Sequence, residues 1–104
     1  MSVISLYAIF ANAEEAERIG SAVVEDGLAA CVNILGTVHS IYRWEGAIAQ
    51  ADEVAAIFKT TETAADALIT RLAQMHSYDV PCIATWPVGK SLDRYADWVE
   101  ASVR

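Results

Sequence analysis

The side chains with the clearest capacity for metal chemistry gather in one short segment. His76, Tyr78, Asp79 and Cys82 fall within seven residues. They supply an imidazole nitrogen, a carboxylate and a thiol, which are donor types that bind zinc and copper in proteins. Their spacing matches no recognised zinc-binding pattern. A histidine next to a helix C-terminus can also act only on the helix dipole, so a structural and a metal-binding interpretation of His76 both stay open.

Cys31 is the other thiol of the chain. It lies between Ala30 and Val32, and a free cysteine in such an apolar run most often packs as a small hydrophobic residue. Two cysteines are too few for a disulfide framework, so free thiols are expected. A catalytic pair of Cys31 and His76 is conceivable, but the sequence holds no nucleophile elbow, phosphate loop or metalloprotease helix. We therefore predict that the protein is not an enzyme.

The remaining polar and aromatic side chains have simpler explanations. His39 is a lone histidine in an extended segment and is expected to be a solvated or hydrogen-bonded side chain and not a metal ligand. Arg43 and Lys59 are surface charges by default, although in a cleft they could hold an anion. Aromatic residues at strand and helix spacing usually build cores and interfaces, and we assign four of them to a contact between subunits: Tyr42, Trp44, Tyr95 and Trp98.

Composition and charge exclude several classes of partner. The 104 residues predict one domain, residues 1–104, with 14 acidic and 7 basic residues and a net charge of -7. No basic cluster is present, so nucleic acid and anionic membranes are poor partners. No apolar run is long enough for a membrane span, and the N-terminus lacks the positive region of a signal peptide, so a cytoplasmic location is expected. The 55% hydrophobic content favours burial of further surface against another subunit.

The elements that must position these residues alternate along the whole chain. A strand over Val3–Phe10 leads to a helix that Asn12 and Glu15 cap and that Gly27 ends. Extended segments follow over Leu28–Leu35 and Thr37–Trp44. The pair Glu45-Gly46 then turns the chain into a strand over Glu53–Thr60.

The second half repeats the alternation. An apolar stripe predicts a helix over Thr61–Met75, Cys82–Trp86 reads as a strand, and Ser91 is expected to cap a last helix. The order βαββαβ plus a helix predicts an α+β fold, a ferredoxin-like sandwich with an antiparallel sheet and an extra C-terminal helix. Apolar residues on both faces of Glu53–Thr60 indicate that helices cover one face and a neighbouring subunit the other.

Several short motifs of the sequence resemble those of the CutA divalent-cation-tolerance family, and they occur in the same order and at the expected spacing along the chain. They are Leu28-Ala29-Ala30-Cys31-Val32-Asn33, Ser40-Ile41-Tyr42-Arg43-Trp44-Glu45-Gly46, Lys59-Thr60, His76-Ser77-Tyr78-Asp79-Val80-Pro81, and Tyr95 with Trp98. The resemblance implies a tight homotrimer similar in architecture to the PII signalling proteins, and a link to tolerance of copper and other divalent cations. It also implies that Cys31 lies near the clefts between subunits, where a copper ligand has been considered.

Two positions depart from the family pattern. Ser77 stands where the family usually has proline, and Cys82 stands where it usually has glutamate. The second change replaces a hard oxygen ligand by a soft sulfur, which shifts the expected preference towards copper(I) or zinc.

The leading hypothesis is a homotrimer that binds copper or another divalent ion, with zinc possible, at inter-subunit clefts through Cys31, His76, Asp79 and Cys82. Tyr78 is a further contact in this hypothesis. The alternative is a PII-like signalling or scaffold trimer whose clefts hold a small molecule or a partner protein, with Arg43, Trp44, Lys59 and Tyr78 lining the cleft.

Overall fold

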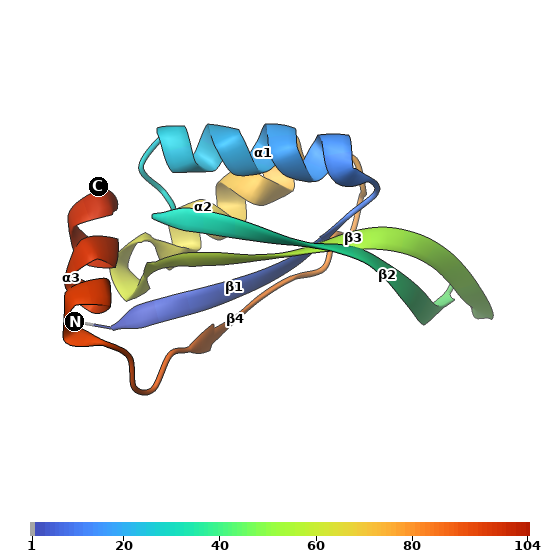
Figure 1. The fold of residues 1–104 in the computed structure, drawn as a ribbon. Helices are drawn as coiled ribbons and strands as arrows, with labels where there is room; N and C mark the ends of the chain where they lie inside the picture. The colour runs from blue at the N-terminus through green and yellow to red at the C-terminus, as the bar shows by residue number, and fades with distance from the viewer. Residues whose placement is uncertain (1) are drawn as a thin grey trace.

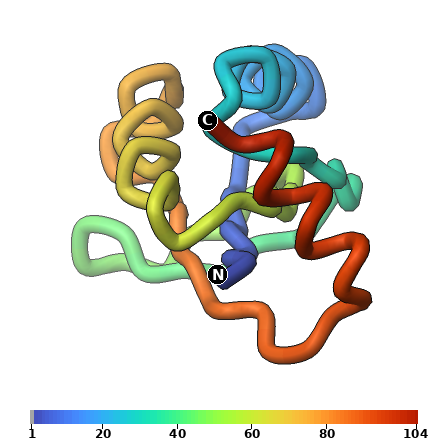
Figure 2. The backbone as a smooth tube through the Cα atoms, turned by 90° about the vertical axis from the view of Figure 1, so that its left-hand side faces the viewer, coloured from blue at the N-terminus to red at the C-terminus, as the bar shows by residue number. Residues whose placement is uncertain are grey.

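Four antiparallel strands form one sheet in the order β2-β3-β1-β4. The structure is a computed structural model that describes residues 2–104. Its elements are β1 (Val3–Phe10), α1 (Ala13–Glu25), β2 (Cys31–Trp44), β3 (Ala47–Thr61), α2 (Glu62–Met75), β4 (Ile83–Pro87) and α3 (Asp93–Ser102). Helices α1 and α2 lie side by side on one face of the sheet, and α3 lies at one end (Figures 1 and 2). The predicted ferredoxin-like fold with an extra C-terminal helix is confirmed.

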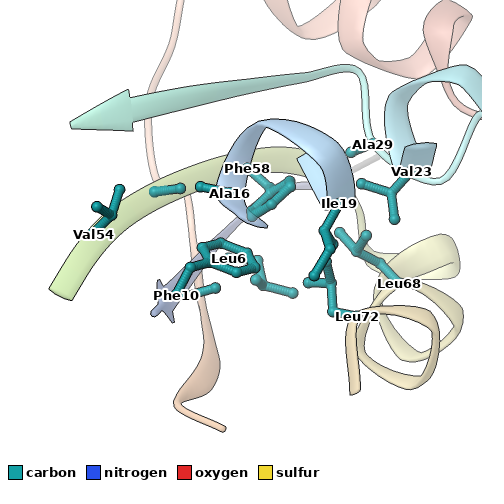
Figure 3. Close-up of a cluster of buried hydrophobic side chains, with 12 residues drawn as sticks. Leu6, Phe10, Ala16, Ile19, Val23, Ala29, Val54, Phe58, Leu68 and Leu72 are labelled. Carbon is teal, nitrogen blue, oxygen red and sulfur yellow. The ribbon is translucent and has the colours of Figure 1, made fainter. Parts of the chain in front are cut away.

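The core lies between the sheet and these two helices (Figure 3). Leu6, Ala8 and Phe10 alternate along β1 and point to the helices, as the period of two in a strand requires. Ile19 of α1 and Leu68 of α2 meet them and are fully buried. Val3 contributes instead to a smaller cluster with Ala30 and Val99, which holds α3 against the end of the sheet.

Both ends of α1 follow the sequence signals. The Asn12 side chain accepts a hydrogen bond from the Glu15 N–H at 2.9 Å, and Oε1 of Glu15 accepts one from the Ala11 N–H at 3.0 Å. The reciprocal bond of the expected capping box therefore reaches one residue further back than Asn12. Gly27 has φ 75°, the left-handed conformation that closes many helices.

The hairpin of β2 and β3 is longer than predicted. Pairing runs from the Trp44–Ala47 pair to the Cys31–Lys59 pair with one irregularity, so β3 begins at Ala47 and not at Glu53. The turn at Glu45-Gly46 is confirmed, with φ 49° and 81° at its two residues. We call residues 37–53 the arm. It projects past the helices in Figure 1 and gives the subunit its longest dimension, 45 Å.

One irregularity lies at the base of the arm. Ile34 pairs with Ala56 and Gly36 pairs with Ala55, so Leu35 is an extra residue in a β-bulge. Gly36 has φ 108°, which favours glycine. Beyond the bulge, the even-numbered residues of β2 lie on the side of the sheet that is opposite the helices.

Four other boundaries differ from the predictions. Strand β2 begins at Cys31 and not at Leu28, because the Leu28 and Ala29 N–H groups donate to the Val23 carbonyl and close α1. Ser91 does not cap α3: the cap position is Leu92, and no side chain bonds to the first turn. Thr61 is the cap residue of α2 and not part of its first turn, and β4 is displaced by one residue to Ile83–Pro87.

No helix within residues 2–104 has the length and apolar character needed to cross a membrane.

Replacing Leu68 by alanine should lower the free energy of unfolding by about 2–5 kcal/mol, because the fully buried side chain would leave a cavity between α2 and the sheet. Urea unfolding at fixed protein concentration measures the change. Asp66→Ala, an exposed change on the same helix, is the matched control and should stay within about 0.5 kcal/mol of the parent. Equal losses in both variants would contradict this placement of the core.

Candidate functional site

A cavity of about 580 Å³ lies between the arm and the segment that follows α2. Alternate residues of β2 form one wall, since side chains two apart share a strand face. The polar lining residues are Ser40, Glu53, Tyr78, Asp79 and Cys82. The apolar and aromatic lining residues are Ile9, Tyr42, Trp44, Val80 and Pro81. The cavity thus combines carboxylates, a thiol and aromatic rings, and three separate strands contribute to it.

Three partly buried hydrogen bonds and one ring stack hold the segment after α2 in place. Oε2 of Glu15 accepts a hydrogen bond from the Ser77 N–H at 2.9 Å. The His76 Nε2–H donates to the Ile9 carbonyl at 2.7 Å, and His76 Nδ1 accepts from the Tyr78 N–H at 3.0 Å. The ring of His76 also stacks on Phe10, with 5.2 Å between ring centroids. These bonds fix the backbone from which Tyr78, Asp79 and Cys82 reach the cavity.

Glu53 is the electrostatic centre of the cavity. The residue is only 8% exposed, and its Oε2 accepts a hydrogen bond from the Tyr78 hydroxyl at 2.7 Å. Burial and this hydrogen bond raise the pKa of Tyr78 to about 12. Partial desolvation and the charge of Glu53 also raise the pKa of the Cys82 thiol. Cys82 therefore keeps its proton at neutral pH unless a ligand displaces it.

The four predicted metal ligands do not converge. Asp79 and Cys82 line the cavity, but both nitrogens of His76 are engaged by the backbone, which gives this residue a structural role within the subunit. Cys31 lies in a separate depression beside α1, where its sulfur is 3.8 Å from the Tyr95 hydroxyl. Within residues 2–104 no three His, Cys, Asp or Glu side chains are grouped so that they could hold a metal ion.

Cys31 and His76 are also far apart along the sheet. Cys31 is paired through Lys59 with Ser5, whereas His76 bonds to Ile9, four residues further along β1. Four residues of a strand span about 13 Å. The conceivable catalytic pair of Cys31 and His76 is therefore not assembled in the subunit.

The two predicted cationic cleft residues lie outside the cavity. Arg43 is next to Tyr42 and Trp44 in β2 and so faces the opposite side of the arm. Lys59 shares the sheet face of Glu53 but is six residues away along β3, about 20 Å. Trp44 and Tyr78, the other two predicted cleft residues, do line it.

The aromatic residues assigned to a subunit contact occupy two places. Tyr42 and Trp44 project from the arm and are 41% and 49% exposed. Tyr95 and Trp98 pack together on α3 with 5.8 Å between ring centroids, and Trp98 is also exposed. Their contact with another subunit stays a prediction.

His39 is hydrogen-bonded through both of its ring nitrogens. Its Nδ1 lies 2.9 Å from Oδ1 of Asp52 and its Nε2 lies 2.8 Å from Oε1 of Gln50, on the face of the arm opposite the cavity. Because both oxygens accept, both ring nitrogens donate, which is the protonated form. The hydrogen bonds to Asp52 and Gln50 accordingly raise the pKa of His39.

Two important residues were missed by the sequence reasoning. Glu53 appeared only as the first residue of a strand, and Glu15 only as a capping residue. A glutamate at the edge of the apolar run Val54–Phe58 was the available signal for Glu53. No local pattern could have indicated that Glu15 bonds to Ser77, since 62 residues separate the two in sequence.

Comparison with known proteins decides the family. Residues 4–102 match the family described as CutA1 divalent ion tolerance protein. The chain belongs to this family. The divalent-cation tolerance protein CutA of Thermotoga maritima is 41% identical over 101 residues, which cover 97% of this chain and 99% of the relative.

Two further relatives set the range of the comparison. The chloroplastic CutA of Arabidopsis thaliana is 33% identical over 101 residues, or 97% of this chain, which spans only 56% of that protein's length. The solved structure of the periplasmic divalent cation tolerance protein CutA from Archaeoglobus fulgidus superposes with a TM-score of 0.94 at 37% identity, covering 98% of this chain and 99% of the other. The Thermotoga maritima and Archaeoglobus fulgidus relatives are named as cation tolerance proteins and not as enzymes.

The buried carboxylate of Glu15 predicts a specific loss of stability in acid. Burial alone would raise its pKa, but the hydrogen bonds from Ser77 and Ala11, aided by His76, outweigh burial and lower it. The stabilisation is therefore complete above the ordinary glutamate pKa of about 4.3 and is lost as the pH falls through the lower, folded value. Urea unfolding between pH 7 and pH 3 should show a steeper loss in the parent than in Glu15→Gln. Parallel curves would contradict the role assigned to this carboxylate.

The charge of Glu53 predicts the reactivity of Cys82. In a Cys31→Ala background Cys82 is the single thiol left to react. Its alkylation by iodoacetamide at pH 8 should be slower than that of an unperturbed thiol. Glu53→Gln should speed the reaction, because the thiolate no longer forms beside a negative charge. Asp79→Asn removes another carboxylate of the same cavity and is the matched control, with little change expected. An equal acceleration by both variants would show that the effect is not specific to Glu53.

Proposed function

We propose that this chain assembles as a homotrimer that binds copper or another divalent metal ion, zinc included, at the clefts between its subunits. In this way it would contribute to divalent-cation tolerance. The observation that carries the proposal is the cavity beside the arm, which places the thiol of Cys82 with the carboxylates of Glu53 and Asp79.

Exposed apolar surface supports the assembly. The arm projects beyond the helices and carries large apolar side chains on both of its faces: Ile41, Tyr42, Trp44 and Ile48. Trp86 of β4 is also exposed, on the sheet face that the helices leave open, where it lies against Tyr7. Large apolar side chains left exposed in this number are typical of protein interfaces. A neighbouring subunit would cover the part of this surface that does not line the cavity.

The donor set supports a soft or borderline metal ion. Cys82 supplies sulfur, which suits copper(I) and zinc, and Glu53 and Asp79 supply oxygen. In this proposal the ligand set is completed by residues of another subunit, because residues 2–104 of one subunit bring no three donors together. Metal binding would release the Cys82 proton, so affinity would rise with pH. Cys31 and His76, placed as they are, are not contacts of this site.

The second candidate function is that of a PII-like module for a small molecule or a partner protein. The size of the cavity and the aromatic side chains of Tyr42 and Trp44 favour it, since ligand pockets are concave and largely apolar. The anionic ligand expected from Arg43 and Lys59 does not suit this cavity, which neither residue lines.

We also propose that the protein acts in the cytoplasm. Cys31 and Cys82 are both free thiols, which suits a reducing compartment. The Archaeoglobus fulgidus relative is described as periplasmic, so cell fractionation is the direct check. Recovery in a periplasmic fraction would overturn this part of the proposal.

Native mass spectrometry of the reduced protein, with and without copper(I) or zinc, tests subunit number and metal uptake together. We expect a trimer that takes up stoichiometric metal. Cys82→Ala should keep the trimer and lose most of the uptake, because the sulfur donor is gone. Cys31→Ala removes the same atom outside the cavity, is the matched control, and should bind as the parent does.

Three results would contradict the proposal. A trimer that takes up no metal would remove the metal-binding function, and a monomer would remove the inter-subunit clefts. Loss of uptake only in Cys31→Ala would move the metal to the depression beside α1.

A further inference from the structure

We propose that the cavity between the arm and residues 78–82 binds an organic cation, an amine or quaternary ammonium with a small apolar body. This inference rests on the second candidate function above and names its ligand class. It does not require that the cavity also binds a metal ion.

The lining of the cavity is negative and holds no cation. Two of its ten lining residues are carboxylates, Glu53 and Asp79, and none is Lys, Arg or His. Only two ion pairs form within residues 2–104, Arg18 with Glu14 and His39 with Asp52, so Glu53 has no positive partner there. A carboxylate that is 8% exposed and lacks a counter-charge attracts a cation more strongly than a solvated one. The charge of the lining selects a positive ligand.

Neighbouring groups already respond to this negative charge. The hydroxyl of Tyr78 donates a hydrogen bond to Oε2 of Glu53 at 2.7 Å. The ligand meets two carboxylates and no further anion.

Aromatic rings supply the apolar part of the site. Tyr42 and Trp44 line the wall formed by β2, and both are partly exposed, so their rings are accessible to a ligand in the cavity. The face of an aromatic ring attracts a cation, most strongly in Trp, and desolvated ammonium groups are held in this way. Val80 and Pro81 add aliphatic surface from the other side. Carboxylate and aromatic groups together suit an alkylated ammonium.

The size of the cavity favours an organic ligand over a bare ion. A metal ion is held by donors at about 2.0–2.6 Å, and no three donors are so grouped within residues 2–104. A volume of about 580 Å³ lies within the range of small-molecule sites, roughly 300–1,000 Å³. The space fits a molecule with one charged end and an apolar body.

Isothermal titration of the assembled protein with benzyltrimethylammonium tests the inference. Benzyl alcohol is the neutral comparison and benzoate the anionic one. We expect the cation to bind, with affinity at least about tenfold higher than either comparison. Equal binding of benzyl alcohol would show a merely apolar pocket, and preference for benzoate would show an anion site. Either result, or no binding of the cation at all, would overturn the inference.

Two pairs of variants locate the site. Glu53→Gln removes the charge but keeps an acceptor for Tyr78 and should weaken binding of benzyltrimethylammonium by about tenfold or more. Asp52→Asn removes the same charge on the opposite face of β3, is the control, and should bind as the parent does. Trp44→Leu should also weaken binding, whereas Trp98→Leu, an exposed tryptophan outside the cavity, should not. Unchanged binding in Glu53→Gln would overturn the placement.

Native mass spectra of the same samples with copper(I) separate this inference from the metal proposal. Binding of benzyltrimethylammonium without copper uptake would overturn only the metal proposal. Copper uptake by the trimer without binding of the organic cation would overturn only the inference made here.

Discussion

The β2–β3 hairpin extends beyond helices α1 and α2, which cover only its base. Most features of the site depend on this difference in length. Helices α1 and α2 bury one face of the sheet only as far as the base of the arm. Beyond that point the hairpin keeps its hydrogen bonds but lacks a packing layer on either face. It therefore presents Tyr42 and Trp44 to solvent, forms one wall of the cavity, and leaves apolar surface that a single subunit cannot bury.

The opposite wall is held by charge and hydrogen bonding. Glu15 belongs to the first turn of α1, yet its carboxylate bonds to the Ser77 N–H, so one side chain both caps a helix and anchors a distant segment. His76 joins the same segment to β1 and stacks on Phe10 of the core. The polar wall of the cavity is thus tied to the hydrophobic core through two residues that do not line the cavity.

Local signals predicted the fold well, and non-local contacts explain where they failed. Asn12, Gly27 and the Glu45-Gly46 turn act within a few residues of themselves, and all three hold in the structure. Ser91 was expected to cap α3, but Leu92 occupies the cap position and no side chain bonds to the first turn of the helix. For the site, proximity in sequence grouped Tyr78, Asp79 and Cys82, and these three line one cavity. It could not indicate that both nitrogens of His76 bond to the backbone of Ile9 and Tyr78, or that Cys31 lies beside Tyr95 of the last helix, because these contacts depend on the fold.

The bulge at Leu35 determines which side chains of the arm reach the cavity. A strand alternates faces with every residue, so an extra unpaired residue before the arm reverses the faces of the residues that follow it. With the bulge, Ser40, Tyr42 and Trp44 face the cavity; if Leu35 instead paired with Ala55 in a regular ladder, His39, Ile41 and Arg43 would take those positions. The side chains that a ligand meets in this fold are therefore set by strand register as well as by residue identity.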